Sequence, residues 1–399
     1  MSLKVLWIAP YLFYPPRAGG QFSIYPWAKE LSRRGWKLFL VQYHSPWGFL
    51  SRSLERLDWA ENVITIEPRR FQSNTEYLKR LILSSDSFLK IRNDVPDIYH
   101  KLKKIAEDFP PNFIIISHSY MGFLIPFLRK LFPWSKILID LHNLEWRAYQ
   151  NELSENDFLK RALALINYIR LKEEEKKALS SCDGIIFPSP VEGKFVAFFK
   201  KPLLWRPARF PEERILFEDE LLRNRDVLLT SSLNVDFICE EILEFLKKAW
   251  LRYRKVFKNA NFWLVGREPL NWFREKASKF EGVRLTGWVD DVSPYVRRSR
   301  IFVAPFKRTM GSLTKIISAW SWGLPVITTT IVAKGLKCEP GKHLLVGKDL
   351  DELLVCCLRV AKDDRLALSL AKEARELVDR EYSLDIFINR FERWVRKLS

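Results

Sequence analysis

The chain alternates short apolar runs with longer stretches in which apolar residues recur every three or four positions. The run KVLWIAP (4–10) has no polar residue after its lysine, as expected for a strand buried on both faces of a parallel sheet. Helical spacing then covers 21–34 and stops at Gly35. Further apolar runs of this half lie at 36–43, 62–66, 112–117, 136–141 and 183–189. Apolar runs that alternate with helical segments predict a parallel sheet with helical crossovers.

The alternation breaks down once, over residues 200–225, which carry three prolines. A second series of apolar runs follows, at 226–232, 261–266, 282–287, 300–305 and 324–329, and helical patterns near 350–361, 363–380 and 384–397 close the chain. We therefore predict an α/β protein with two Rossmann-like domains, residues 1–205 and 206–380, followed by a terminal helix at 381–399. Ligands of such sheets bind beyond the carboxyl ends of the strands, so we expect the two domains to face each other across a binding cleft.

Composition agrees with two globular domains. The 399 residues exceed one ordinary core, and 47% of them are hydrophobic. The sequence contains no run of about 18 apolar residues, so a transmembrane span is not expected. The first ten residues, MSLKVLWIAP, do not resemble a signal peptide. The five cysteines form neither a CxxC pair nor a His/Cys cluster. A structural zinc site and a disulfide framework are therefore not expected, and a cytoplasmic location is favoured.

The net charge of +18 predicts attraction to anions. Lys and Arg are spread over both halves, so the charge does not by itself choose a partner. The segments 25–37 and 123–136 mix basic and aromatic residues. One interpretation is that these segments contact the inner face of an anionic membrane peripherally. The other is that their basic residues are solvated and their aromatic residues are buried. Non-specific nucleic-acid binding is a further alternative, and its affinity would fall steeply with salt.

The stretch KRTMGSLTKIISAWSWGLPVITT combines a basic loop, a helix and a strand. The first amides of a helix lack internal partners, and the helix dipole adds positive charge there. Gly311 allows a close approach, Ser312 suits the cap, and Arg308 and Lys315 add full charges. We predict a phosphate site at this turn. An ordinary strand-to-helix turn capped by serine is the alternative.

The surrounding motifs carry a resemblance. In order, they are NFWLVGREP, GVRLTGWVDDVSPYVRRSRIFVAPF, the helix above and TTIVAKGLKCEPGKHLLVGKDLDELL. Their order and spacing resemble the nucleotide-sugar domain of GT-B glycosyltransferases, most closely the retaining family 4 type within glycosyl transferases group 1. The first half, with KVLWIAPYLFYPPRAGGQFSIYPWAKELSRRGWKLFLV and KILIDLHNLE, resembles the acceptor domain. The resemblance implies an acceptor domain over 1–205, a nucleotide-sugar domain over 206–380, and a last helix that packs back on the first domain.

The resemblance also implies roles for individual residues. His142 would position the donor sugar, and Lys315 would stabilise the departing diphosphate. The other donor-binding positions are Gly19 and Gly20 at the phosphates, Gly287, Trp288 and Val289 at the base, and Arg267, Arg308, Gly311, Ser312, Leu313 and Thr314 at the diphosphate. No metal ion and no cofactor besides the donor are implied, so the Asp290-Asp291 pair is interpreted as part of a loop. His118 and Tyr120, at the end of another predicted strand, are candidate acceptor contacts. His44 and Glu145 are candidates at the cleft edge, for which a structural role is the favoured interpretation.

Ser318 departs from this family pattern. The family carries a glutamate there that binds the nucleotide ribose, and many members carry another where Met310 stands. Leu313 replaces a basic residue. A carboxylate that accepts hydrogen bonds from ribose hydroxyls contributes about 1.5–3 kcal/mol to binding. The absence of this glutamate therefore predicts weak donor binding, an altered donor or a compensating residue. The expected function is retaining, metal-independent transfer of a sugar to a hydroxyl acceptor, namely a glycan, a lipid-linked or a polysaccharide precursor. The alternative is a catalytically impaired binding or scaffold protein.

Overall fold

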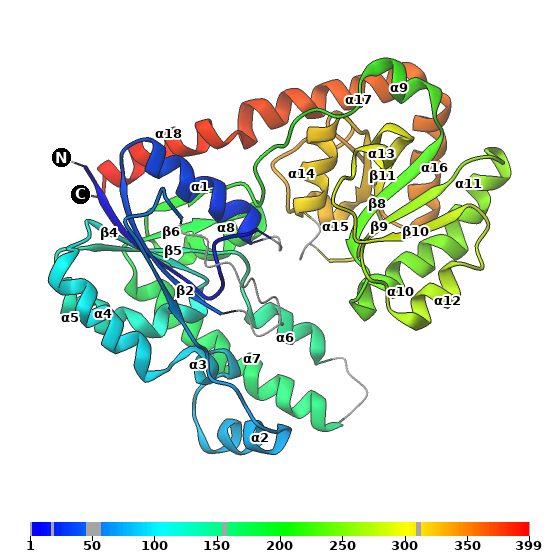
Figure 1. The fold of residues 1–399 in the computed structure, drawn as a ribbon. Coiled ribbons are helices and arrows are strands. Elements are labelled where there is room, and N and C mark those ends of the chain that lie inside the picture. Colours follow the sequence, from blue (N-terminus) through cyan, green and yellow to red (C-terminus); the bar gives the residue numbers. More distant parts are fainter. Residues whose placement is uncertain (1, 17–19, 45–56, 154–157, 309–312, 399) are drawn as a thin grey trace. The chain divides into compact units, whose positions relative to one another are not determined.

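The structure is a computed structural model that describes residues 2–16, 20–44, 57–153, 158–308 and 313–398 (Figure 1). The chain forms two compact units. Unit 1 comprises Met1–Ala208 together with Ile388–Ser399, and unit 2 comprises Arg209–Phe387. Each unit contains one parallel sheet flanked by helices, so the α/β two-domain fold predicted from the alternating pattern is confirmed.

Unit 1 is built on a seven-stranded sheet with the order β3-β2-β1-β4-β5-β6-β7. All its neighbouring strands pair in parallel. The strands are β1 Lys4–Ala9, β2 Lys37–Tyr43, β3 Asn62–Ile66, β4 Phe113–Ser117, β5 Lys136–Asp140, β6 Gly184–Phe187 and β7 Leu203–Trp205. Six of them match the predicted apolar runs. The seventh, β7, lies in the proline-containing segment and has only three residues, too few to produce a recognisable pattern.

The helices of unit 1 are α1 Gln21–Arg33, α2 Asn74–Leu83, α3 Phe88–Asn93, α4 Pro96–Asp108, α5 Ile125–Leu131, α6 Trp146–Glu152, α7 Phe158–Ser181 and α8 Pro190–Val196. Their apolar side chains cover the buried strand residues. Trp7 of β1 is fully buried, and its ring centroid lies 4.4 Å from that of Trp27 in α1. The aromatic residues of 25–37 thus include core residues, as the second interpretation of that segment expected.

The terminal helix α18 (Leu384–Arg396) places its apolar side against unit 1. The Phe391 ring lies 5.1 Å from Trp27 and 5.8 Å from Trp36, measured between centroids. The Trp36 indole also donates a hydrogen bond to the Glu392 carboxylate at 3.2 Å. These contacts confirm that the last helix packs back on the N-terminal domain.

Unit 2 contains a six-stranded parallel sheet with the order β10-β9-β8-β11-β12-β13. The strands are β8 Asp226–Ser232, β9 Phe262–Arg267, β10 Val283–Gly287, β11 Ser299–Ala304, β12 Val326–Thr329 and β13 Leu345–Gly347. The helices are α9 Glu218–Arg223, α10 Asp236–Phe245, α11 Leu251–Val256, α12 Asn271–Ala277, α13 Ser293–Arg297, α14 Leu313–Trp322, α15 Thr330–Ala333, α16 Leu350–Lys362 and α17 Asp364–Leu377. The short edge strand β13 was not predicted as a strand.

Helix α14 is largely buried. Leu313 and every residue from 316 to 322 are buried. A helix that is apolar on nearly all sides belongs in the interior. The chain before it is anchored to the sheet, because the Thr329 hydroxyl donates to the Phe306 carbonyl at 2.6 Å. Within the described ranges, no helix has the length and apolar character that a bilayer crossing requires.

Candidate functional site

The turn between β11 and α14 is described in part. Gly311 and Ser312, and likewise Gly19 and Met310, lie outside the described residues. The predicted amide cluster is therefore represented by Leu313 and Thr314, the first residues of α14. Leu313 is buried, so an apolar side chain suits this position.

Lys315 is the third residue of α14 and is half-buried, with its Nζ 5.3 Å from the centre of the Phe306 ring. Burial lowers the pKa of Lys315 to about 8, because the charged ammonium loses part of its hydration. At neutral pH the group is still mostly protonated. A poorly hydrated cation of this kind gains more from a phosphate partner than a solvated surface lysine does.

The two basic residues that precede the turn are engaged by α10. The Lys307 ammonium lies 2.6 Å from the Glu244 carboxylate. The Arg308 guanidinium lies 4.0 Å from Glu241 and 4.4 Å from the Phe237 ring centre. Arg308 is thus held beside the turn by α10, where its charge is partly balanced by the buried Glu241.

Strands β9 and β10 deliver the other predicted donor residues to the same edge of the sheet. Arg267 is the last residue of β9, directly after Gly266. A Cβ on Gly266 would lie 1.7 Å from the Ser231 carbonyl oxygen, so only glycine permits this close pairing of β8 and β9. Gly287 ends β10 with a φ of 73°, which favours glycine. After it come the exposed Trp288 and the half-buried Val289.

The acidic pair after Val289 makes local hydrogen bonds. The Trp288 indole donates to Asp290 at 3.3 Å, and the Ser293 amide donates to Asp291 at 2.8 Å. Hydrogen bonds from Ser293 lower the pKa of Asp291. Both carboxylates therefore organise the loop that leads into α13.

Ser318 faces a carboxylate from another part of unit 2. Its side chain is 4% exposed, and its hydroxyl lies 3.5 Å from Glu212 Oε1. The other oxygen of Glu212 accepts a hydrogen bond of 2.7 Å from the Trp322 indole, and Arg209 forms an ion pair with the same carboxylate. Sequence reasoning missed Glu212 because it lies in the segment interpreted as a linker, where no motif marks it.

In unit 1, the structure brings together Gly20 and His142. A Cβ on Gly20 would lie 2.9 Å from His142 Nδ1 and 2.8 Å from the Tyr11 hydroxyl. The absence of a side chain at Gly20 thus lets the start of α1 approach the imidazole. Gly20 was predicted at the donor phosphates and His142 at the donor sugar, and the two residues, distant in the sequence, are neighbours in the structure. Tyr11, which no sequence motif marked, lies beside both.

His142 is held by a buried polar network. Its Nε2 lies 3.0 Å from Asp140 Oδ2, and Arg206 donates to Asp140 Oδ1 at 2.8 Å. Burial lowers the pKa of His142 to about 4, although Asp140 opposes this shift. Burial likewise disfavours ionised Asp140, but Arg206 and His142 hold its pKa below the usual range. His142 is therefore neutral at physiological pH, and it can exchange hydrogen bonds with a sugar hydroxyl without carrying a charge.

A second imidazole lies parallel to the first. The His118 and His142 rings are stacked with centroids 4.5 Å apart, and His118 Nδ1 lies 2.8 Å from the Glu145 carboxylate. His118 adopts a φ of 69°, an uncommon backbone conformation for a residue other than glycine. Tyr120 contacts the same ring, at 5.2 Å between centroids. His44 pairs with a different carboxylate: its Nε2 lies 3.2 Å from Glu67 Oε1.

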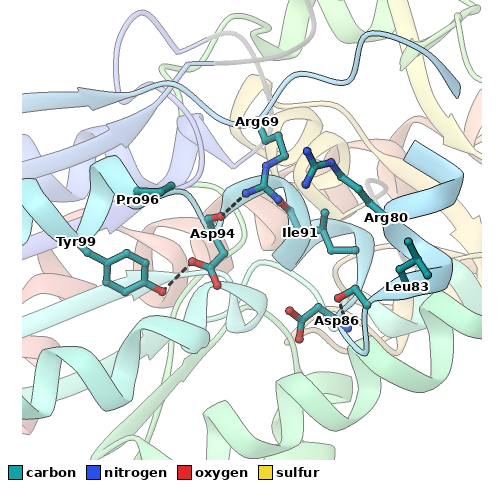
Figure 2. A pocket seen from close by; sticks show the side chains of 9 residues that line it. Arg69, Arg80, Leu83, Asp86, Ile91, Asp94, Pro96 and Tyr99 are labelled. Carbon is teal, nitrogen blue, oxygen red and sulfur yellow. Dashed lines mark hydrogen bonds between the residues drawn. The ribbon is translucent and has the colours of Figure 1, made fainter. Parts of the chain in front are cut away.

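Unit 1 also contains a cavity of about 720 Å³ that none of the predicted site residues lines (Figure 2). Its wall includes Arg69, Arg80 and Tyr99. The Tyr99 hydroxyl donates to the Asp94 carboxylate at 2.8 Å, and Arg69 donates to the Ile91 carbonyl at 2.9 Å. These polar groups hold the chain between α2 and α4 in place.

Comparison with known proteins identifies the region that contains α14. Residues 225–363 match the family model Glycosyl transferases group 1. This group 1 region includes the ends of β9, β10 and β11, together with Lys315 and Ser318. No curated protein matches the sequence significantly.

Solved structures of GT-B glycosyltransferases share the fold of the whole chain. Sucrose-phosphate synthase from Thermosynechococcus elongatus has a TM-score of 0.71 at 15% identity, covering 99% of each chain. HepE from Anabaena, in complex with UDP and glucose, has a TM-score of 0.66 at 10% identity and covers 99% of this chain and 100% of its own. WaaG, a glycosyltransferase involved in lipopolysaccharide biosynthesis, has a TM-score of 0.60 at 14% identity, covering 96% and 98%. The predicted GT-B fold is thus confirmed.

Proposed function

We propose that this protein transfers a sugar from a nucleoside-diphosphate sugar to a hydroxyl group of an acceptor. The observation that carries the proposal is the match of residues 225–363 to the group 1 glycosyl transferases, because this region contains α14 with Lys315. The fold supports it further, since the similar structure of HepE was solved with UDP-glucose bound.

In this proposal the donor binds to unit 2. Its diphosphate lies at the start of α14, where the first helix amides and Lys315 meet the negative charge. As the bond to the sugar breaks, charge accumulates on the departing diphosphate, and a preorganised cation stabilises that charge more than it stabilises the ground state. Arg308 adds positive charge at the same turn, and Arg267, the last residue of β9, adds a further charge at the same edge of the sheet. We propose that transfer needs no metal ion, because these basic groups supply the compensating charge.

We assign to unit 1 the positioning of the donor sugar and the binding of the acceptor. Neutral His142 would hydrogen-bond the sugar, with Gly20 leaving space beside it and Asp140 fixing the imidazole. We further propose that the configuration of the sugar is retained and that no protein nucleophile takes part. The support for retention is the resemblance of the motifs to retaining enzymes.

Turnover of donor sugars tests this function. The full chain would be incubated with UDP-glucose, GDP-mannose and ADP-glucose, and release of each nucleoside diphosphate would be followed, since hydrolysis reveals a competent donor site without a known acceptor. We expect one donor to be consumed. Lys315→Ala should lower kcat/KM by about 10²- to 10³-fold, whereas Lys348→Ala, at an exposed lysine of the same unit, should not. Equal rates for both variants would contradict the assigned role of Lys315.

A binding or scaffold protein without turnover is the second candidate function. The observation that favours it is Ser318 within the group 1 region, together with buried Leu313 in place of a basic residue. This candidate predicts nucleotide binding without consumption of any donor. Detectable hydrolysis or transfer would exclude it.

We also propose that the acceptor is lipid-linked and that unit 1 meets an anionic membrane from its cytoplasmic side. Leu83 of α2 and Phe158 of α7 are 86% and 76% exposed. Arg170 of α7 donates to the Leu81 carbonyl at 2.6 Å, which places the end of α2 beside the middle of α7. Exposed Arg80 adds a cation, whose Nε lies 3.1 Å from Glu76 of the same helix. Apolar residues combined with basic ones suit a bilayer surface.

Vesicle sedimentation tests this membrane contact. The protein should sediment with vesicles that contain 30% anionic lipid, an amount chosen on the order of that in cell membranes, and Leu83→Glu with Phe158→Glu should remain in the supernatant. Sedimentation of the double variant equal to that of the wild type would contradict the assigned surface. Neutral vesicles serve as the control for charge.

A further inference from the structure

Glu212 supplies a carboxylate beside the serine that departs from the family pattern. We propose that Glu212 binds the cis hydroxyl groups of the donor ribose, so that a side chain from the segment before α9 performs the recognition that a helix residue would otherwise provide. This inference rests on the proposed function, because it takes a nucleoside diphosphate as the ligand of unit 2.

The position of Glu212 is fixed from two sides. Its carboxylate contacts Ser318 at 3.5 Å and Trp322 at 2.7 Å, two residues four apart on one side of α14. Its backbone carbonyl accepts a hydrogen bond of 3.1 Å from Arg375 of α17, and Arg375 also donates to the Ser321 carbonyl at 2.7 Å. The segment before α9 is thereby fastened to α14 through α17.

The carboxylate retains room for a ligand. A carboxylate offers about four acceptor positions. Among the residues that the structure describes, Glu212 has one strong hydrogen bond from Trp322, the ion pair with Arg209 and the long contact to Ser318. The Glu212 side chain is 32% exposed, so small molecules reach it. Burial lowers the pKa of Arg209 to about 10, and at neutral pH the guanidinium therefore remains charged beside the carboxylate.

The spacing along α14 suits a nucleotide. Ser318 lies five residues beyond Leu313, which is about 7.5 Å along a helix that rises 1.5 Å per residue. In a nucleoside diphosphate the ribose is attached directly to the first phosphate. A diphosphate at the start of α14 with its ribose along the helix therefore brings the hydroxyl groups toward the second turn. There, one carboxylate can accept hydrogen bonds from both hydroxyls of a cis diol.

Serine at position 318 fits this arrangement. The site is 4% exposed, so a glutamate there would place a second carboxylate against Glu212 in a poorly hydrated place. Two carboxylates at such a distance repel each other. The structure therefore favours one carboxylate at this place, from either α14 or the preceding segment, and this chain has it at Glu212.

The test compares nucleotides with and without ribose hydroxyls by titration calorimetry. The probes are UDP and 2′,3′-dideoxy-UDP, with the GDP and ADP pairs run in parallel. Wild type should prefer the ribonucleotide of one pair. Glu212→Gln should weaken binding of that ribonucleotide about 10- to 100-fold, as expected for the loss of charged hydrogen bonds, and should leave binding of the dideoxy form unchanged. Glu213→Gln, an exposed neighbour with the same change of charge, should behave as wild type.

Position 318 provides the reciprocal experiment. Ser318→Glu alone should weaken binding, because two carboxylates compete, whereas Ser318→Glu combined with Glu212→Gln should restore the preference for ribose. If Glu212→Gln weakened binding of the ribo and dideoxy forms equally, Glu212 would only stabilise the fold, and the inference would be wrong. Unchanged binding of both forms in this variant would also overturn the inference. In both cases the proposed function survives. Failure of the wild type to bind any of the nucleotides would instead contradict the proposed function itself.

Discussion

Burial determines the charge of the key side chains in both units. It lowers the pKa of Lys315 to about 8 and that of His142 to about 4. It raises the pKa of Glu175 to about 8, and the nearby charge of Glu145 adds to this shift. The sequence predicted Lys315 and His142 as candidates from a motif resemblance, but their protonation depends on neighbours from distant segments. Asp140 and Arg206 beside His142 carry no signal of their own in the sequence.

The pKa of Lys315 predicts how nucleotide binding depends on pH. The ammonium form attracts a diphosphate, and in the free protein it is lost as the pH rises through about 8. Affinity for the nucleotide should therefore decline between about pH 7.5 and 9.5, and binding should be accompanied by proton uptake near pH 8. Calorimetry in buffers of different ionisation enthalpy measures both effects. Lys315→Arg keeps its charge and should remove the decline; a decline of equal size in that variant would contradict this assignment.

Glu175 predicts the pH dependence of the stability of unit 1. Its carboxylate accepts hydrogen bonds from the Ser119 hydroxyl and from the Trp146 amide at 3.1 Å. In the folded protein the pKa of Glu175 is about 8, which lies above that of a glutamate in the unfolded chain. At pH values between these two pKa values, folding is therefore accompanied by uptake of a proton. The contribution of Glu175 to stability should therefore fall as the pH rises from about 4.5 to 8.

The variant Glu175→Gln imitates the protonated side chain. It should stabilise unit 1 relative to wild type at pH 8, with an increase in Tm on the order of 5 °C, and this gain should shrink toward pH 5. Thermal unfolding at both pH values measures the difference. A gain that is the same at both pH values would show that packing, and not ionisation, is responsible.

At the scale of elements, the hydrophobic pattern predicted the long strands and helices well. Central parallel strands such as β4 are uninterrupted apolar runs, because both faces are covered. The missed strands β7 and β13 have three residues each and lie at sheet edges, where the pattern carries little information. Glu212 could not be predicted for a different reason. Its role depends on tertiary contacts with α14 and α17, which no periodicity in the proline-containing segment reveals.

Helix α18 should contribute strongly to the stability of unit 1. Phe391 is fully buried between Trp27 and Trp36, so Phe391→Ala leaves a cavity that these rings cannot fill. We expect a loss of about 3–5 kcal/mol in the free energy of unfolding of unit 1. Urea denaturation followed by tryptophan fluorescence measures it. Arg396→Ala, at an exposed position of the same helix, is the control, and equal midpoints for the two variants would contradict the packing role of α18.

For the whole molecule, the two sheets divide the proposed work. Unit 2 contains Glu212 and the group 1 region with α14 and Lys315, and unit 1 contains the network around His142. The net charge of +18 suits the anionic donor that we propose. It also leaves open non-specific nucleic-acid binding, which depends much more steeply on salt than recognition of one nucleotide does.

The most direct test of the account is therefore nucleotide binding by the intact wild-type chain. UDP, GDP, ADP and CMP would be titrated calorimetrically at about 50 and 200 mM salt, two concentrations that separate the two kinds of binding. The account predicts saturable binding of one nucleoside diphosphate with one site per chain and only a mild loss of affinity at the higher salt. Absence of binding for all four, or binding of every anion that disappears at the higher salt, would contradict it.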